Sequence, residues 1–480
     1  MQRKFYSSLF ILILANLLVK PISLFVIDAG FQNELGHVDY GLYFSLLNFS
    51  LLFNILLDFG INNFTTRRVA QNPNKAKRLF GIIFTFRILL FVFYILVISL
   101  LAYVIGYRNE ALYILFILGL NQFIIMAIAY FRSHFAGFHF FKLDALLSVM
   151  DRFLLVVFGS YLLFYADARN TLTIYDFVWL QFITYLISFL IGLILFLKFI
   201  DRPKFHWNLK LSFEIIKRSL PYALLIVMML FYSRIDSVML ERLHYKGAEQ
   251  TGIYAQGFRL LDAFYMFGML FAGLLFPIFS RSLKENKSLV APLLRSSGNL
   301  LIGGAIFIAL ISFYNGEYIL SLVYTEYDQA IIPFHWLMIS FIAICMNFIF
   351  GTLLTASGDL KILIWISFFA ILINVTLNSV FIPEFGAKAT AINACITHFF
   401  AAISQCIYAV KKFSIPITMP DILRYPALIC GMFLFGELFG SFEYFLFYQI
   451  GFGLMLLFLL SFIHVGMLFQ LFNFKENKIK

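Results

Sequence analysis

The chain has 480 residues, of which 62% are hydrophobic and only 13% are charged, and its mean hydropathy is +0.90. A soluble domain is about half apolar and about a quarter charged, so this composition excludes an ordinary soluble protein and indicates a polytopic membrane protein. The net charge of +11 does not indicate nucleic acid as a partner, because the basic residues lie in short loops, where they set membrane topology.

Apolar runs long enough to cross a bilayer recur along the whole chain. The first run follows Arg3-Lys4, has no small-x-small cleavage site, and is interpreted as a retained helix rather than a signal peptide. The predicted fold class is therefore an all-α polytopic membrane protein with about fourteen transmembrane helices. The expected spans are 8–29, 40–64, 79–106, 111–131, 143–166, 175–200, 219–240, 251–279, 298–314, 331–355, 362–382, 386–410, 423–440 and 444–471.

The charges of the loops between these spans predict the orientation. The two termini and the even-numbered loops carry 26 Lys and Arg residues, whereas the odd-numbered loops carry 5. Cytoplasmic loops are enriched in basic residues, so both termini are expected in the cytoplasm. The expected location is the cell inner (plasma) membrane.

A faint internal repeat predicts two halves. Asp28 ends an apolar run, and Gly41-Leu42-Tyr43 opens the next; Asp236 and Gly252-Ile253-Tyr254 stand in the same relation some two hundred residues later. Six helices per half is an even number, so the halves share one orientation and their pseudo-twofold axis lies along the membrane normal. The predicted domains are a six-helix lobe (1–200), a cytoplasmic linker (201–218), a second six-helix lobe (219–410), and two additional helices with a cytoplasmic tail (411–480).

The residues of the first repeat copy resemble a known family. Asn33-Glu34-Leu35-Gly36, Asp39-Tyr40-Gly41-Leu42-Tyr43 and the run 56–64 resemble the polysaccharide-biosynthesis or O-antigen (Wzx-type) flippases of the multidrug/oligosaccharidyl-lipid/polysaccharide exporter superfamily. The resemblance covers nearly the whole chain in helix count and layout. It implies alternating access by the two lobes. The implied cargo is an oligosaccharide on undecaprenyl pyrophosphate, for lipopolysaccharide O-antigen, capsule or exopolysaccharide, moved from the cytoplasmic to the outer leaflet. A polysaccharide polymerase is an expected partner.

A pyrophosphate-linked cargo needs cationic groups within the membrane, where ionisable residues are costly and usually functional. The candidate substrate-binding residues are Lys20, Asp28, Arg234, Arg259 and Asp262, which fall on the first two helices of each half. The alternatives are snorkelling or structural pairing for Lys20, and a local ion pair between Arg259 and Asp262, three residues apart on one helical face.

Two further groups of basic residues have simpler interpretations. Arg67 and Arg68 close the second span on the predicted cytoplasmic side, where topology alone explains them, and a gating or loading role is the alternative. Arg87 and Arg152 fall on the third and fifth spans, for which structural roles are favoured.

The second half contains a candidate cation site. Asn374 and Asn378 are four residues apart on one helical face, and Asp236 and Thr390 lie on neighbouring spans. The related lipid II flippases have a sodium site on the same three helices, so the resemblance implies coupling to Na⁺ or H⁺. Asn378 replaces an acid of that pattern and Ala394 replaces a hydroxyl. Hydrogen bonding between the helices, or neutralisation of the carboxylate by a neighbouring arginine, is the alternative.

The chain carries no enzyme signature, and no cofactor or metal is expected. There is no HExxH, no Cys/His ligand spacing and no Walker motif, and the four cysteines lie inside apolar segments as packing residues. Two rival functions remain: an ion-coupled multidrug and toxin extrusion carrier, and a membrane polysaccharide polymerase or acyltransferase. A cationic cavity argues against cationic drugs, and no strong catalytic pair supports the enzyme.

Overall fold

The computed structural model describes residues 16, 18–71, 76–165, 172–200, 209–416, 418–440, 442 and 444–462. All regular secondary structure in these ranges is helical, which confirms the predicted all-α fold class. The α-helices are α2 (Ala29–Leu52), α3 (Ile61–Gln71), α4 (Ala76–Ile105), α5 (Asn109–Gly137), α6 (Phe141–Phe164), α7 (Ile174–Phe199), α8 (Leu209–Leu243), α9 (Gly247–Glu285), α10 (Val290–Tyr314), α11 (Gly316–Ser321), α12 (Ile331–Ala356), α13 (Leu360–Phe413), α14 (Met419–Phe439) and α15 (Phe445–Leu459). Shorter segments are the π-helix η1 (Ser23–Asp28) and the 3-10 helices η2 (Asn54–Leu57), η5 (Lys287–Leu289) and η6 (Asp328–Ala330).

Ten helices in the described ranges are long and apolar enough to span a membrane. One of them, α13, has 54 residues and contains two predicted spans, which meet at the non-helical Gly386 (φ 53°, ψ −131°). Gly36 (φ 73°, ψ 178°) separates the first two predicted spans within α2 in the same way, and the last predicted span contains the 15-residue α15. Residues 1–15, the linker residues 201–208 and the C-terminal tail lie outside the described residues.

The chain forms two compact units. Unit 1 comprises residues 1–256, 323–326 and 375–390, and unit 2 comprises residues 257–322, 327–374 and 391–480. The lobes anticipated from the repeat, 1–200 and 219–410, remain a prediction. Residues 209–218 of the predicted linker are helical and form the first part of α8.

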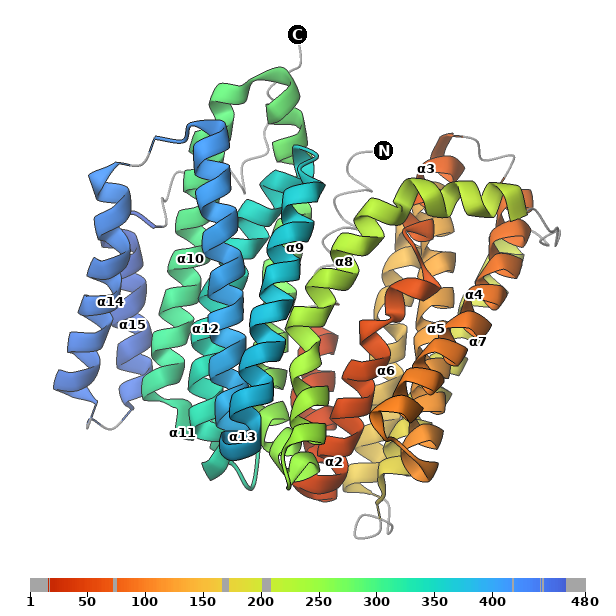
Figure 1. Ribbon diagram of the computed structural model, residues 1–480, viewed down its shortest axis with the longest axis horizontal. Coiled ribbons are helices and arrows are strands. Elements are labelled where there is room, and N and C mark those ends of the chain that lie inside the picture. Colours follow the sequence, from red (N-terminus) through yellow and green to blue (C-terminus); the bar gives the residue numbers. More distant parts are fainter. Residues whose placement is uncertain are drawn as a thin grey trace. The chain divides into compact units, whose positions relative to one another are not determined.

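Aromatic side chains fill the core of unit 1. Phe80 of α4 is 2% exposed, and its ring centroid lies 4.0 Å from that of Phe196 of α7 and 5.1 Å from that of Tyr130 of α5. Figure 1 shows that α8 is bent along its length. Pro221 lies inside this helix and removes a backbone hydrogen bond, which is the usual cause of such a bend.

In unit 2 the C-terminal helix pair packs on α10. Figure 1 shows α10 between α12 and the pair α14–α15. Thr418 begins α14 with a reciprocal cap, in which its backbone N–H donates to the Asp421 carboxylate at 3.1 Å. Arg295 of α10 contacts the same carboxylate at 3.0 Å, so one acidic residue both caps α14 and ties it to α10.

Candidate functional site

The two copies of the Gly-x-Tyr motif are in contact within unit 1. A Cβ atom added to Gly41 of α2 would lie 1.8 Å from the carbonyl oxygen of Ala248 and 2.6 Å from the backbone nitrogen of Gly252. A Cβ atom added to Gly252 of α9 would lie 2.1 Å from the carbonyl oxygen of His37. Gln32 Nε2 donates to the Gly252 carbonyl at 2.8 Å. The absence of side chains therefore lets the backbones of α2 and α9 touch.

A short segment before α12 is bound to the same end of α2. Asn33 Nδ2 donates to the Val323 carbonyl at 2.9 Å, and Asn33 Oδ1 accepts from the Thr325 backbone N–H at 3.2 Å. His37 Nε2 lies 3.6 Å from a carboxylate oxygen of Glu326. Burial holds the pKa of His37 below its ordinary value, so this imidazole is predominantly neutral at pH 7.

A third contact at this end of unit 1 joins α8 to α2 through Tyr107. The Tyr107 hydroxyl donates to a Glu241 carboxylate oxygen at 2.9 Å and lies 2.9 Å from Ser45 Oγ. The Arg242 guanidinium stacks over the Tyr107 ring at 3.6 Å and lies 2.7 Å from the Glu241 carboxylate. These polar contacts link helices of both predicted repeats at one end of unit 1.

Asp28 is the first predicted site residue, and it lies inside unit 1. It ends the π-helix η1 and is 8% exposed, and its carboxylate accepts from the Tyr40 hydroxyl at 2.7 Å. Nearby in sequence, the Tyr43 hydroxyl accepts from Gln181 Nε2 at 2.7 Å. π-helical turns inside membrane helices are frequent at functional sites, so the local backbone agrees with a functional role for Asp28.

The predicted cations Lys20 and Arg234 also lie in unit 1. Lys20 is half-buried, and Arg152 of α6 is the charged side chain with the largest electrostatic effect on it. Arg234 of α8 donates from Nη1 to Asn48 Oδ1 of α2 at 3.2 Å. Arg234 therefore contacts a polar group on a neighbouring helix, whereas the main charged neighbour of Lys20 is a second cation.

Of the four residues predicted to form the cation site, Asp236 and Asn378 are in direct contact within unit 1. Asn378 Nδ2 donates to Asp236 Oδ1 at 2.7 Å, and Asp236 is 1% exposed. The Thr390 hydroxyl donates to the Gly386 carbonyl of its own helix at 2.9 Å. Asn374 belongs to unit 2, where its Nδ2 lies 3.4 Å from Thr397 Oγ1.

The other predicted site residues lie in separate places. Arg259 Nη1 lies 4.0 Å from the Asp262 carboxylate in unit 2, and these side chains are 12% and 19% exposed. This is the local pair that the sequence offered as the alternative to cargo contact. Arg67 and Arg68 are exposed near the end of α3, and the Arg68 guanidinium lies 5.4 Å from the centre of the Phe64 ring.

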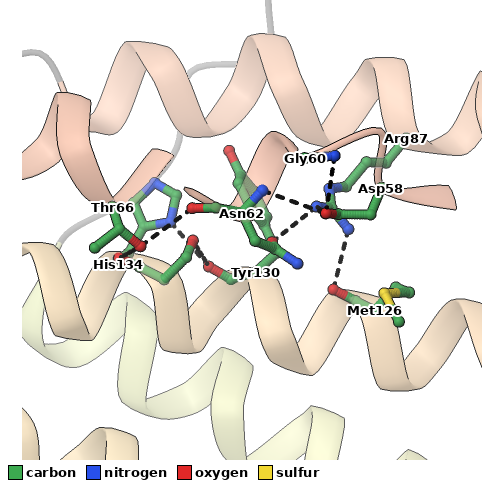
Figure 2. Close-up of polar contacts among 9 residues, drawn as sticks. Asp58, Gly60, Asn62, Thr66, Arg87, Met126, Tyr130 and His134 are labelled. Carbon is green, nitrogen blue, oxygen red and sulfur yellow. Dashed lines mark hydrogen bonds and ion pairs between the residues drawn. The ribbon is translucent and has the colours of Figure 1, made fainter. Parts of the chain in front are cut away.

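One buried polar cluster in unit 1 was not foreseen. Arg87 of α4 is 2% exposed, and its Nη2 lies 2.5 Å from Asp58 Oδ1 and 2.8 Å from Asn62 Oδ1 (Figure 2). Its Nη1 donates to the Met126 carbonyl at 3.0 Å, and its guanidinium lies 4.7 Å from the centre of the Tyr130 ring. The charge is thus paired, hydrogen-bonded and stacked, as a buried arginine requires.

This cluster stabilises an interruption of the helical backbone between α2 and α3. Phe59 (φ 44°) and Gly60 (φ 77°) interrupt the helix, and the Asp58 carboxylate accepts from the backbone N–H groups of Gly60 and Asn62. Asp58 therefore satisfies backbone donors that the break leaves without helical partners. The sequence assigned Arg87 a structural role but gave no partner. The sequence did contain a signal for this pair, because Arg87 and Asp58 are each an isolated charge in an apolar run.

Two protein-family models match the sequence of the chain. The family model described as "Polysaccharide biosynthesis protein" matches residues 5–283, and the model described as "MatE" matches residues 221–380. No curated protein matches the chain by sequence.

Several solved structures share the fold. A lipid II flippase MurJ in an inward closed conformation is 14% identical, with a TM-score of 0.69, and the match covers 96% of this chain and 99% of that chain. An inward-facing multidrug resistance MATE family transporter of the MOP superfamily is 14% identical, with a TM-score of 0.63, covering 82% of this chain and 94% of that chain. A MOP superfamily transporter from Pyrococcus furiosus is 14% identical, with a TM-score of 0.59, covering 85% and 95%.

Proposed function

Since the chain belongs to the polysaccharide biosynthesis protein family, within the MOP superfamily of membrane transporters and flippases, we propose that it flips a lipid-linked oligosaccharide. The proposed cargo is an O-antigen, capsule or exopolysaccharide unit on undecaprenyl pyrophosphate. It moves from the cytoplasmic to the outer leaflet by alternating access. The observation that most supports this cargo is the pair of cations, Lys20 and Arg234, on helices that the sequence predicts to cross the membrane, with Arg234 hydrogen-bonded to Asn48.

The chemistry of the cargo explains why such cations are needed. A pyrophosphate leaves water and the headgroup region only if cationic groups replace its hydration, and charge-assisted hydrogen bonds are the strong ones. Lys20, Asp28, Arg234, Arg259 and Asp262 are the proposed substrate-binding residues. The carboxylates of Asp28 and Asp262 would lower the net positive charge of this binding site, so that the cargo is bound weakly enough to be released.

The contacts between the repeat motifs suggest how access alternates. Gly41, Gly252 and the neighbouring polar contacts close one end of unit 1. Under the predicted topology this is the outer end, and the cargo would enter from the cytoplasm past Arg67 and Arg68. Opening of this end, with closure at the other, would deliver the glycan to the outer leaflet.

Ion coupling is part of the proposal. Asp236, Asn374, Asn378 and Thr390 are proposed to bind Na⁺, or Asp236 to carry a proton, so that an ion gradient drives the cycle. Asp236 and Asn378 are already in hydrogen-bond contact, and oxygen ligands with one carboxylate suit a hard monovalent cation. No ATP-binding motif occurs in the chain, in agreement with this source of energy.

An ion-coupled exporter of multidrug and toxin extrusion type is the second candidate, because the MatE model matches residues 221–380. The two candidates differ in the charge of their cargo. Cations such as Lys20 and Arg234 repel the cationic drugs of such exporters and attract a pyrophosphate. Drug susceptibility of the deletion strain separates them, since only the exporter predicts sensitivity to organic cations.

The decisive experiment is a deletion strain of the source bacterium. We expect lipid-linked glycan to accumulate on the cytoplasmic side of the inner membrane and surface glycan to disappear, with both restored by the wild-type gene. Single cysteines at Lys204 and Lys475 should be shielded from an impermeant thiol reagent, while one at Gln329 should be labelled. Normal surface glycan in the deletion strain would remove the proposed function.

A further inference from the structure

The helix that carries Lys20 and α6 run in a fixed parallel register. Asn16 Nδ2 donates to Ser148 Oγ at 3.0 Å, a separation of 132 residues. A Cβ atom on Gly159 would lie 2.6 Å from Ile27, again 132 residues apart (159 − 27). Further along, Gly30 meets Leu163, with a separation of 133 residues (163 − 30). Both partners advance together, so the helices are parallel.

This register brings two cations level with each other. Lys20 is one helical turn beyond Asn16, and Arg152 is one turn beyond Ser148, with the same separation of 132 residues (152 − 20). In agreement, Arg152 is the charged group that acts most strongly on Lys20. The Arg152 side chain is 39% exposed although it lies at the middle of α6.

The carboxylates near this pair lie closer to Arg152 than to Lys20 in the contacts of the described residues. Asp151 is the acid that acts most strongly on Lys20, and its carboxylate lies 3.7 Å from Arg152 Nε. It is adjacent to Arg152 in sequence, a spacing that prevents the two from sharing a helical face. Asp144 is already occupied by Arg132 at 2.6 Å. Asp28 also acts electrostatically on Arg152. Among the described residues, however, no carboxylate lies within 4.0 Å of the Lys20 ammonium group.

We propose that Lys20 and Arg152 together hold one phosphoryl group, the pyrophosphate of the lipid-linked cargo, with the anion bridging the two helices. This inference rests on the proposed function and adds Arg152 to the substrate-binding residues. Two like charges that face each other inside a membrane protein are costly unless an anion lies between them. Arg152 supplies the planar fork that phosphoryl oxygens match, and Lys20 supplies a point charge.

The test is binding of geranyl pyrophosphate, a short-chain prenyl pyrophosphate, to the purified full-length protein in uncharged detergent. We expect Lys20→Gln and Arg152→Gln each to weaken binding at least tenfold, and Arg152→Lys to weaken it less. The double variant should lose less than the product of the single losses, because both residues hold the same group. Arg132→Gln is the matched control, since that cation is already paired, and it should bind as the wild type does.

Melting temperatures without ligand separate this role from a structural one. Removing one of two facing cations should leave the melting temperature unchanged or raise it, whereas loss of a structural ion pair would lower it. Wild-type affinity in both Gln variants would overturn the pairing and leave the proposed function intact. Equal displacement of the probe by phosphatidylglycerol would overturn it in favour of an ordinary lipid headgroup site. If the wild-type protein binds no pyrophosphate, the lipid-pyrophosphate cargo is itself wrong and the inference fails with it.

Discussion

Gly41 of α2 and Gly252 of α9, the first residues of the two Gly-x-Tyr motifs, meet backbone to backbone within unit 1. Neither position has room for a methyl group, since added Cβ atoms would lie 1.8 Å and 2.1 Å from carbonyl oxygens. The repeat that is barely visible in the sequence is therefore a physical contact in the structure, and it joins α2 to α9.

Replacing Gly41 by Ala should open this contact. Alanine favours a helix over glycine by about 1 kcal/mol, but overpacking costs about 1–3 kcal/mol, and here the obstacle is backbone that cannot rotate away. We expect a lower melting temperature and faster thiol labelling of a cysteine placed at His37. Gly273→Ala in α9 is the control, because nothing lies within 4 Å of its added Cβ. Equal melting temperatures for the two alanine variants would contradict the contact.

Removing the Arg87 guanidinium should destabilise unit 1 strongly. Breaking a buried ion pair by deleting one partner costs about 3–5 kcal/mol when the remaining charge is fully buried. The Asp58 side chain is 19% exposed, so we expect a loss at or below the lower end of this range. Arg87→Met should therefore lower the melting temperature, and adding Asp58→Asn should recover part of the loss. Arg281→Met is the control: that arginine pairs with Glu285 on the surface, with 76% of its side chain exposed, so stability should not change. A harmless Arg87→Met would show that the break after α2 does not depend on this residue.

The burial of His37 predicts a dependence of stability on pH. Burial lowers the pKa of His37 in the folded state, so the unfolded chain binds a proton more readily. The contribution of His37 is fully present above the ordinary histidine pKa of about 6.5 and is lost as the pH falls below it. His37→Gln should flatten the melting temperature between pH 7 and pH 5, whereas the same change at the exposed His139 should not. An unaltered pH profile in His37→Gln would rule out this contribution.

Arg259 and Asp262 offer a test between cargo contact and local pairing. If Arg259 binds the cargo, Arg259→Ala should abolish surface glycan without loss of protein from the membrane, and Arg259→Lys should recover only part, because lysine lacks the bidentate fork. In the double variant Arg259→Ala, Asp262→Ala the defect should persist. Recovery of glycan in that double variant would mean that Arg259 only neutralises its neighbour, 4.0 Å away.

The proposed cation site predicts stabilisation by sodium. A ligand that binds only the folded state raises the melting temperature, so purified protein should melt higher in sodium than in potassium. Asp236→Asn and Asn374→Ala should remove the difference, while Asn299→Ala in α10 should retain it. Identical melting curves in the two salts, together with full flipping by Asp236→Asn, would leave the Asp236–Asn378 hydrogen bond as a structural contact.

The positions of the helices could be predicted from the sequence more completely than the contacts between side chains of different helices. Hydrophobic runs identified the helices because each must cover its own backbone hydrogen bonds in lipid, which makes a span a local property of the chain. The pairing of Arg87 with Asp58, and the alignment of Lys20 with Arg152, depend on how separate helices are rotated and shifted against each other. No local pattern encodes that register, so the sequence favours only a structural role for Arg152 and predicts no partner for Asp58.

The two glycines that interrupt α2 and α13, Gly36 and Gly386, have a genetic consequence. Gly36 and Gly386 combine a positive φ with an extended ψ, a conformation that is essentially restricted to glycine and that asparagine and aspartate do not adopt readily. Every missense change of a glycine codon therefore introduces a side chain that the joint does not accommodate. In a saturation mutagenesis screen for surface glycan, these two positions should be nearly empty of survivors, whereas lipid-facing positions a few residues away should accept most apolar residues.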